Sequence, residues 1–169
     1  MKKLALLFAG LSLFVATGCS DDDNPTIEYP LVGTWQPVKE VVTSVPVGGT
    51  PVSDEIAYTD CQKEGRWVFN AGNTGKRTDK GDSATPGMCD ITFDRNFTYT
   101  FDKDSKAVQI KYQGIVEPDK GKVTTLNENT LNLTIEDTTD PTEYNSVTYT
   151  FKRNPQKNSE KILKIKISS

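Results

Sequence analysis

Apolar and polar residues alternate along most of the second half of the chain. The alternating runs, with aromatic or β-branched residues at every second position, are residues 97–101, 108–112, 131–135, 147–151 and 163–167. A period of two is typical of a strand with one face on a core and the other in water. This arrangement is common in antiparallel sheets. Beyond the N-terminal segment, no stretch repeats its apolar residues at helical spacing.

Two earlier segments and the gaps between the runs complete the pattern. Residues 31–47 and 66–70 are predicted as strands, the first bent near Pro37, whereas residues 70–88 look irregular because they hold four glycines and few apolar residues. Short polar connections with turn-forming residues are residues 94–96, 102–105, 118–121 and 127–129. We expect an all-β fold with little helix: an antiparallel up-and-down β-barrel of about eight strands.

The N-terminus has the layout of a secretory signal. Lys2 and Lys3 precede an apolar stretch over residues 4–15, and small residues then lead to Cys19. The stretch is shorter than the roughly 20 apolar residues that span a bilayer. We therefore predict a signal peptide over residues 1–18. An uncleaved anchor helix is the alternative, but the three acids at 21–23 argue against it.

Residues 15–19, Val-Ala-Thr-Gly-Cys, resemble the lipobox of bacterial lipoproteins. The resemblance implies that the Cys19 thiol takes a diacylglycerol and that the chain is cut before this residue. It also implies acylation of the new amine, for example with palmitate. Several acyl chains anchor a protein stably where one is marginal.

Residues 19–29 form an acidic tether between the lipid and the domain. The acids at 21–23, followed by Pro25, are expected to stay solvated and extended. The run also resembles the acidic export signal of surface-displayed lipoproteins of the Bacteroides group. This implies a lipid-anchored protein of the outer membrane, exposed at the cell surface, with the periplasmic face of that membrane as the alternative.

Charge and length limit the partners of the mature chain. Removal of residues 1–18 lowers Lys+Arg from 20 to 18 against 23 acids, so the net charge goes from −3 to −5. Nucleic acids need clustered cations, so we expect no nucleic-acid partner. The remaining length fits one domain, over residues 30–169.

Two cysteines, Cys61 and Cys89, remain once Cys19 is lipidated. In an exported protein such a pair is expected to form a disulfide. The chain has no His, and two isolated cysteines do not make a zinc site, so we predict no metal.

The sequence offers no support for catalysis. It lacks His and a Gly-x-Ser-x-Gly motif, and scattered acids are more often solvated surface than paired catalysts. Aspartates 90, 94, 102 and 104 lack the spacing of an EF-hand loop. We therefore expect no enzyme, no catalytic residues and no cofactor.

The segment Leu-Val-Gly-Thr-Trp at 31–35 resembles the Gly-x-Trp signature that opens lipocalins. The mature layout is similar to lipocalin-like lipoproteins of the Bacteroides group over roughly residues 31–153. The resemblance implies a lipocalin-like (calycin) barrel whose base is formed by Gly33 and Trp35. A basic residue after the last barrel strand, Arg153 or Lys152, would pack over that Trp. The usual C-terminal helix is replaced by a strand-like run at 161–167.

If the barrel forms, its interior is lined by aromatic residues from the alternating runs. They are Trp67, Phe69, Phe97, Tyr99, Phe101, Tyr112, Tyr149 and Phe151. Small eight-stranded barrels can be packed solid, so these rings could instead simply fill the core.

Three functions remain open, the third being an accessory subunit of an outer-membrane assembly, for which the sequence offers only the anchor. The first is an outer-membrane-anchored lipocalin-like protein that binds a small apolar or amphipathic ligand. The second is a solid-core barrel whose loops recognise a protein or glycan, for example as a hydrolase inhibitor. The segment between Cys61 and Cys89 would then be the contact loop.

Overall fold

The computed structural model describes residues 30–137, 139 and 142–154. The strands are β1 (Gly33–Pro46), β2 (Val52–Ala57), β3 (Arg66–Asn70), β4 (Thr74–Asp82), β5 (Cys89–Phe101), β6 (Ala107–Tyr112), β7 (Asp119–Leu126), β8 (Thr130–Asp137) and β9 (Glu143–Arg153). Within these described residues the one helical element is the 3₁₀ turn η1 (Gln62–Glu64). The all-β prediction is therefore confirmed.

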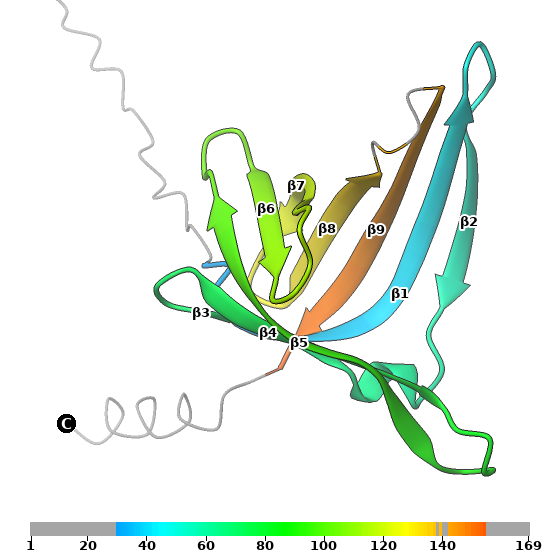
Figure 1. Cartoon of the computed structure of the whole chain (residues 1–169), viewed down its shortest axis with the longest axis vertical. Helices are drawn as coiled ribbons and strands as arrows, with labels where there is room; N and C mark the ends of the chain where they lie inside the picture. Colours follow the sequence, from blue (N-terminus) through cyan, green and yellow to red (C-terminus); the bar gives the residue numbers. More distant parts are fainter. Residues whose placement is uncertain (1–29, 138, 140–141, 155–169) are drawn as a thin grey trace, which may run out of the picture.

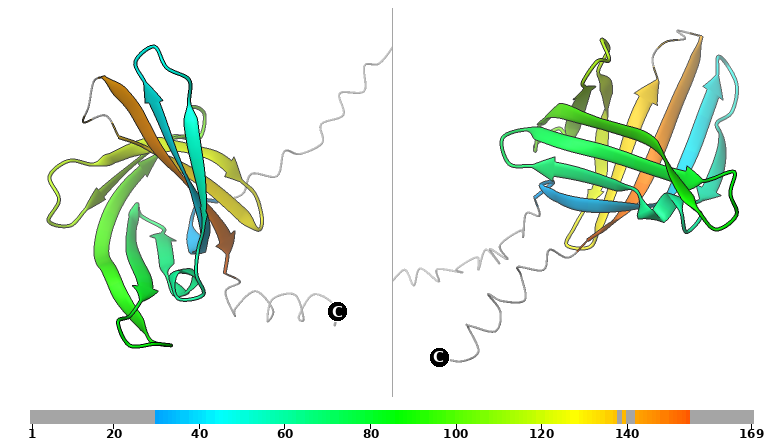
Figure 2. Two further views of the ribbon diagram at one scale, coloured as in Figure 1. Left: turned by 90° about the vertical axis from the view of Figure 1, so that its right-hand side faces the viewer. Right: turned by 60° about the horizontal axis from the view of Figure 1, so that its bottom comes forward.

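The strands form one antiparallel sheet that closes on itself (Figures 1 and 2). From β3 to β9 each strand pairs with the next one in sequence, and β9 pairs with β1 from Pro46↔Glu143 to Trp35↔Arg153. Strands β2 and β3 pair with different parts of the same edge of β1. The barrel therefore has eight positions around its wall, as an up-and-down barrel of about eight strands predicts.

The predicted bend in the first strand is also present. The pairing of β1 with β9 shifts by one residue between Pro37 and Lys39, which is a β-bulge. A bulge increases local twist, so β1 can follow the curved wall along its whole length.

Inward-facing residues form a single core. Its buried members are Leu31, Trp35, Trp67, Phe69, Phe97, Tyr99, Val108, Ile110, Tyr112, Val123, Leu131, Leu133 and Phe151. The rings meet edge to face: Phe69 lies 5.2 Å from Phe97 and 5.1 Å from Tyr99, centroid to centroid. Such pairs add to the free energy gained by burying their area.

One glycine permits this packing. Gly75 on β4 lies directly opposite Phe97 on β5, and a Cβ at Gly75 would overlap the Phe97 ring and the Val68 carbonyl. The ring therefore lies over the backbone of β4.

The prediction of irregular structure over residues 70–88 is wrong. This segment contains β4, which pairs along its length with β5 and over Thr74–Thr78 with β3. Its sequence, TGKRTDKGD, offers no apolar residue, so the signal used to find the other strands is missing. Backbone pairing on both edges holds the strand instead.

Two predicted turns are also strands, and two are confirmed. Residues 94–96 belong to β5, and residues 119–121 begin β7. The turn at 102–105 is present: Asp102 Oδ1 accepts from the amides of Asp104 and Ser105. The turn at 127–129 is present too, where the Asn127 amide donates to the Thr130 carbonyl. The strand predicted at 161–167 lies outside the described residues.

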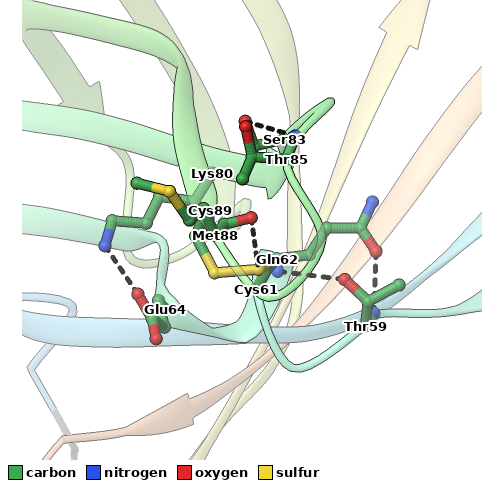
Figure 3. The surroundings of a disulfide bond; sticks show 9 residues. All are labelled: Thr59, Cys61, Gln62, Glu64, Lys80, Ser83, Thr85, Met88 and Cys89. Carbon is green, nitrogen blue, oxygen red and sulfur yellow. Dashed lines mark hydrogen bonds and ion pairs between the residues drawn. A yellow bond between two sulfur atoms is a disulfide. The ribbon is translucent and has the colours of Figure 1, made fainter.

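The predicted disulfide joins Cys61 and Cys89, whose Cα atoms are 5.4 Å apart. It links the residue that precedes η1 to the first residue of β5 (Figure 3). Beside it, Lys80 on β4 forms a 2.6 Å ion pair with Glu64 of η1. The connection between β2 and β3 is therefore fastened to β4 by the ion pair and to β5 by the disulfide.

The connections between strands gather at two ends. At one end, called the closed end, lie the turns at 71–73, 102–106 and 127–129 with Pro30 and Asn154. At the other, called the open end, lie the connections at 47–51, 83–88 and 113–118 and the link from β8 to β9.

Candidate functional site

The closed end is sealed by Trp35 and Arg153. The Arg153 guanidinium lies 4.1 Å from the centre of the Trp35 ring. It donates to the carbonyls of Glu128 (2.8 Å), Val32 (3.1 Å) and Pro30 (2.8 Å). The Trp35 indole N–H donates to the Leu31 carbonyl at 2.9 Å.

Gly33 completes this end of the barrel. Its φ of +152° is a conformation that side chains disfavour, and a Cβ there would meet the Arg153 guanidinium. The structure thus brings Gly33, Trp35 and Arg153 together. Lys152, the other candidate base, is exposed.

The aromatic residues proposed as ligand lining divide into three groups. Phe69, Phe97, Tyr99, Tyr112 and Phe151 are buried in the core. Phe101 packs against the core from the closed end. Trp67 and Tyr149 face a hollow above that core. The barrel interior is therefore packed toward the closed end and hollow toward the open end.

This hollow, here called the inner chamber, has a volume of about 190 Å³. It lies between the packed core and the open end. Its lining residues are Pro37, Glu40, Tyr58, Gln62, Trp67, Arg77, Asp79, Lys80, Thr92 and Tyr149.

Arg77 is the floor of the inner chamber. It projects from β4, and its guanidinium lies 4.2 Å from the ring centre of Trp67, 4.9 Å from that of Phe93 and 5.6 Å from that of Tyr149. Cations are attracted to the faces of aromatic rings. The guanidinium of Arg77 therefore lies among the aromatic rings that face the chamber.

Each of the three guanidinium nitrogens of Arg77 has a polar partner. Its Nη2 and Nε lie 2.6 and 2.7 Å from Asp79 Oδ2, and its Nη1 donates to the Tyr112 hydroxyl at 3.2 Å. Burial acts to lower the pKa of Arg77, but the hydrogen bond to Asp79 leads the opposing effects and the pKa is raised overall. The guanidinium is therefore a permanent cation, neutralised locally by Asp79.

A second polar pair lies on the opposite wall. The Tyr58 hydroxyl donates to Glu40 Oε2 at 2.6 Å. Burial, then the hydrogen bond and charge of Glu40, raise the pKa of Tyr58 well above its usual value, so this donor keeps its proton. Glu40 pairs directly with Tyr149 across β1 and β9, which places both on the inner face.

Sequence reasoning missed Arg77, Glu40 and Tyr58. It assigned charged residues to the solvent face because alternation marks a strand only when the inward positions are apolar. On β4 the inward positions are Gly75, Arg77 and Asp79. The remaining signal was the alternation of small or charged residues alone, which does not distinguish a strand from a polar loop.

Comparison with known proteins identifies the family. Residues 31–133, more than half of the chain, match the lipocalin-like domain family. The chain belongs to the lipocalin-like family. No curated protein matches this lipocalin-like chain.

Solved structures similar to this lipocalin-like protein are distant in sequence. A deswapped triple mutant of bovine odorant-binding protein is 15% identical. The match covers 80% of this chain and 84% of the mutant's chain, with a TM-score of 0.38. Lobster apocrustacyanin A1 is 14% identical, with 79% and 67% coverage and a TM-score of 0.43. Aphrodisin, a sex pheromone from female hamster, is 9% identical, with 79% and 83% coverage and a TM-score of 0.36.

A larger hollow lies on the outer wall of the lipocalin-like barrel. This outer groove, of about 770 Å³, crosses β4, β5 and β6. Thr74, Thr98 and Lys111 lie opposite one another in register, on the face away from the core. The inner chamber is the more sheltered of the two hollows and is lined by inward-facing residues of the barrel, so we take the chamber as the candidate ligand site.

The other predicted features of this lipocalin-like chain lie partly outside the described residues. Cys19, the signal peptide and the whole acidic tether fall in the undescribed residues 1–29. Across the described ranges, no helix has the length and apolar character to cross a membrane. The same ranges contain no group of three or more His, Cys, Asp or Glu placed to bind a metal ion.

The loop proposed as a contact element is not one. Between Cys61 and Cys89 the chain is mostly barrel wall, since it forms β3 and β4. The part that projects as a loop is residues 83–88. The hypothesis of a long recognition loop in this segment is therefore wrong.

Proposed function

We propose that this lipocalin-like protein binds a small amphipathic ligand in the inner chamber. One observation carries the proposal: the closed barrel keeps a hollow of about 190 Å³ above a solid core, lined by both aromatic rings and polar groups. Ligand sites are typically concave and apolar with a few well-placed polar groups.

The open end extends the chamber with apolar surface. Ile56 lies opposite Glu40 across β1 and β2, and Val42 follows two residues after Glu40 on the same face. These side chains are 39% and 38% exposed. A ligand with its polar head in the chamber would lay its apolar tail against them, and each buried methylene contributes about 0.8 kcal/mol.

The experiment fills the chamber. N-phenyl-1-naphthylamine, a neutral apolar fluorophore, is titrated into the purified domain and its fluorescence gain is followed. Thr92 lines the chamber, so Thr92→Trp should weaken probe binding at least tenfold. Thr98→Trp, on the outer face of the same strand, is the matched control and should bind like the wild type. Equal binding by wild type and Thr92→Trp would remove the chamber as the site.

We further propose that the mature protein is a lipoprotein of the outer membrane. The signal-like layout of residues 1–18, the lipobox-like run that ends at Cys19 and the acids at 21–23 in the predicted tether over residues 19–29 support this. The chain would enter the barrel at the closed end, where Pro30 lies, so the open end would point away from the anchor. Intact-mass analysis of wild type and Cys19→Ala tests the lipid, and protease treatment of intact cells tests surface display.

A second candidate function is recognition of a glycan by the outer groove. Its lining combines apolar surface with hydroxyl, amide and ammonium groups, from residues such as Thr74, Asn96, Lys111 and Gln113. A glycan array probed with wild type and with Thr98→Arg, which would fill the groove, tests it. A glycan bound equally by both variants would rule out the groove.

A further inference from the structure

We infer that the inner chamber selects a ligand with a cationic head, such as a primary ammonium, and that Glu40 is the group that holds it. This inference deepens the proposed function and rests on it. It follows from the charges that line the chamber and from which of them already have partners.

The two cations of the lining are already paired. Arg77 is bound to Asp79 through two nitrogens, at 2.6 and 2.7 Å. Lys80 is bound to Glu64 at 2.6 Å, beside the disulfide (Figure 3). An anionic ligand head would have to share one of these cations with the carboxylate that it already neutralises, and would place a second negative charge beside Asp79 or Glu64.

Glu40 differs from these groups. Among the described residues its carboxylate accepts from the Tyr58 hydroxyl and has no ion pair with a Lys or Arg. Tyr58 leaves the second carboxylate oxygen available, because its hydrogen bond is to Oε2. A carboxylate accepts hydrogen bonds and offers none, so its complement is a donor, and a cationic donor most of all.

The surroundings of Glu40 also suit a cation. Tyr149 pairs with Glu40 across the β1–β9 seam, and the ring of Trp67 lies 5.3 Å from that of Tyr149. Aromatic faces attract an ammonium that has left water. Asp119 on β7, outside the chamber lining, adds a further carboxyl that feels the charge of Arg77; burial raises its pKa and that charge opposes the rise. The chamber therefore holds Arg77 as its own bound cation and retains an acidic position for a second.

The test uses three ligands that share an eight-carbon chain: octylamine, octanol and octanoate. Each displaces N-phenyl-1-naphthylamine from the domain at pH 7. We expect octylamine to bind about tenfold more tightly than octanol, with octanoate weakest, as one charge-assisted hydrogen bond in a partly dry site would give. Glu40→Gln should bring octylamine to the level of octanol while leaving octanol unchanged.

Two variants control this result. Glu55→Gln removes an acid on the neighbouring strand whose side chain pairs with Lys39, and it should keep the preference for the amine. Asp54→Asn removes an exposed acid from the same strand, and it should keep the preference as well. Equal binding of the three ligands, or a preference that persists in Glu40→Gln, overturns the inference and leaves the proposed function intact. Failure of every ligand and of the fluorophore to bind overturns both.

Discussion

Arg153 pairs with Trp35 across the seam between β9 and β1, and its guanidinium covers the indole ring at 4.1 Å. The two residues stand where the first strand begins and the last one ends, so a single contact closes the sheet and caps its interior. The carbonyls that Arg153 binds belong to the N-terminal segment and to the turn after β7. It therefore ties three separate parts of the chain to the closed end.

Replacement of Arg153 should destabilise the barrel. Arg153→Ala removes three hydrogen bonds from a charged donor and the contact with Trp35, and we expect a loss of about 2 kcal/mol in the free energy of unfolding. Urea unfolding followed by tryptophan fluorescence measures it. Lys152→Ala, at the exposed neighbouring position, should change the midpoint little. A loss below about 0.5 kcal/mol for Arg153→Ala would show that the cap is not important for stability.

The pair of Arg77 and Asp79 gives a second prediction. Arg77→Met leaves the Asp79 carboxylate with the Trp67 indole N–H, 3.1 Å away, as its remaining partner. We expect a cost of about 3 kcal/mol, because an uncompensated charge is then half-buried. Adding Asp79→Asn should recover part of that loss, which a double-mutant cycle in urea measures.

Arg95 offers the matched control for this cycle. It lies opposite Arg77 across β4 and β5, and it is exposed. Arg95→Met should therefore cost much less than Arg77→Met. Equal costs, or strictly additive effects of Arg77→Met and Asp79→Asn, would contradict the role of Arg77 as the paired floor of the chamber.

How much of the fold can be predicted from the sequence depends on which side chains face inward on each strand. Strands β6, β8 and β9 alternate apolar and polar residues and are predicted correctly, and so is the aromatic half of β5. Strand β4 was missed because its inward residues are glycine and charged side chains. Strand β2 was missed because every residue in it is exposed and it pairs with β1 alone.

The same physics explains the candidate site. Trp67 and Tyr149 could be predicted because they continue an alternating apolar face. Glu40 and Arg77 could not be predicted. A charged side chain faces inward only when a residue from another strand neutralises it or stacks on it, and the sequence does not show which strands are neighbours. For Arg77 that environment comes from β3, β5 and β9 together.

Asp119 and Asp94 should give stability opposite dependences on pH. Burial raises the pKa of Asp119, whereas hydrogen bonds from Thr78 and Lys76 lower that of Asp94. For Asp119 the folded state holds its proton to higher pH than the unfolded state, so its ionisation costs stability as pH rises through the raised value. For Asp94 the stabilisation is present above its ordinary pKa and is lost as pH falls through the lowered value.

The measurement is urea unfolding of wild type and two variants between pH 2 and pH 7. Asp119→Asn should be more stable relative to wild type at pH 7 than at pH 4. Asp94→Asn should be less stable than wild type at pH 7, with the difference shrinking toward acid. If both variants shift stability in the same direction as pH rises, the two carboxyls do not differ as their surroundings indicate.

The disulfide should stabilise the barrel chiefly by restricting the unfolded chain. Cys61 and Cys89 are separated by 28 residues, and closing a loop of that length contributes about 3–4 kcal/mol. We expect the Cys61→Ala/Cys89→Ala variant to lose about that much in urea, and wild type treated with a reducing agent to behave like it. The same agent should leave the double variant unchanged. Because the bond joins η1 to the start of β5, hydrogen exchange should rise most in residues 58–65 and 83–91, and little in β8 and β9. A uniform rise across the barrel would instead mean that the bond acts on global stability alone and does not hold this part of the wall in place.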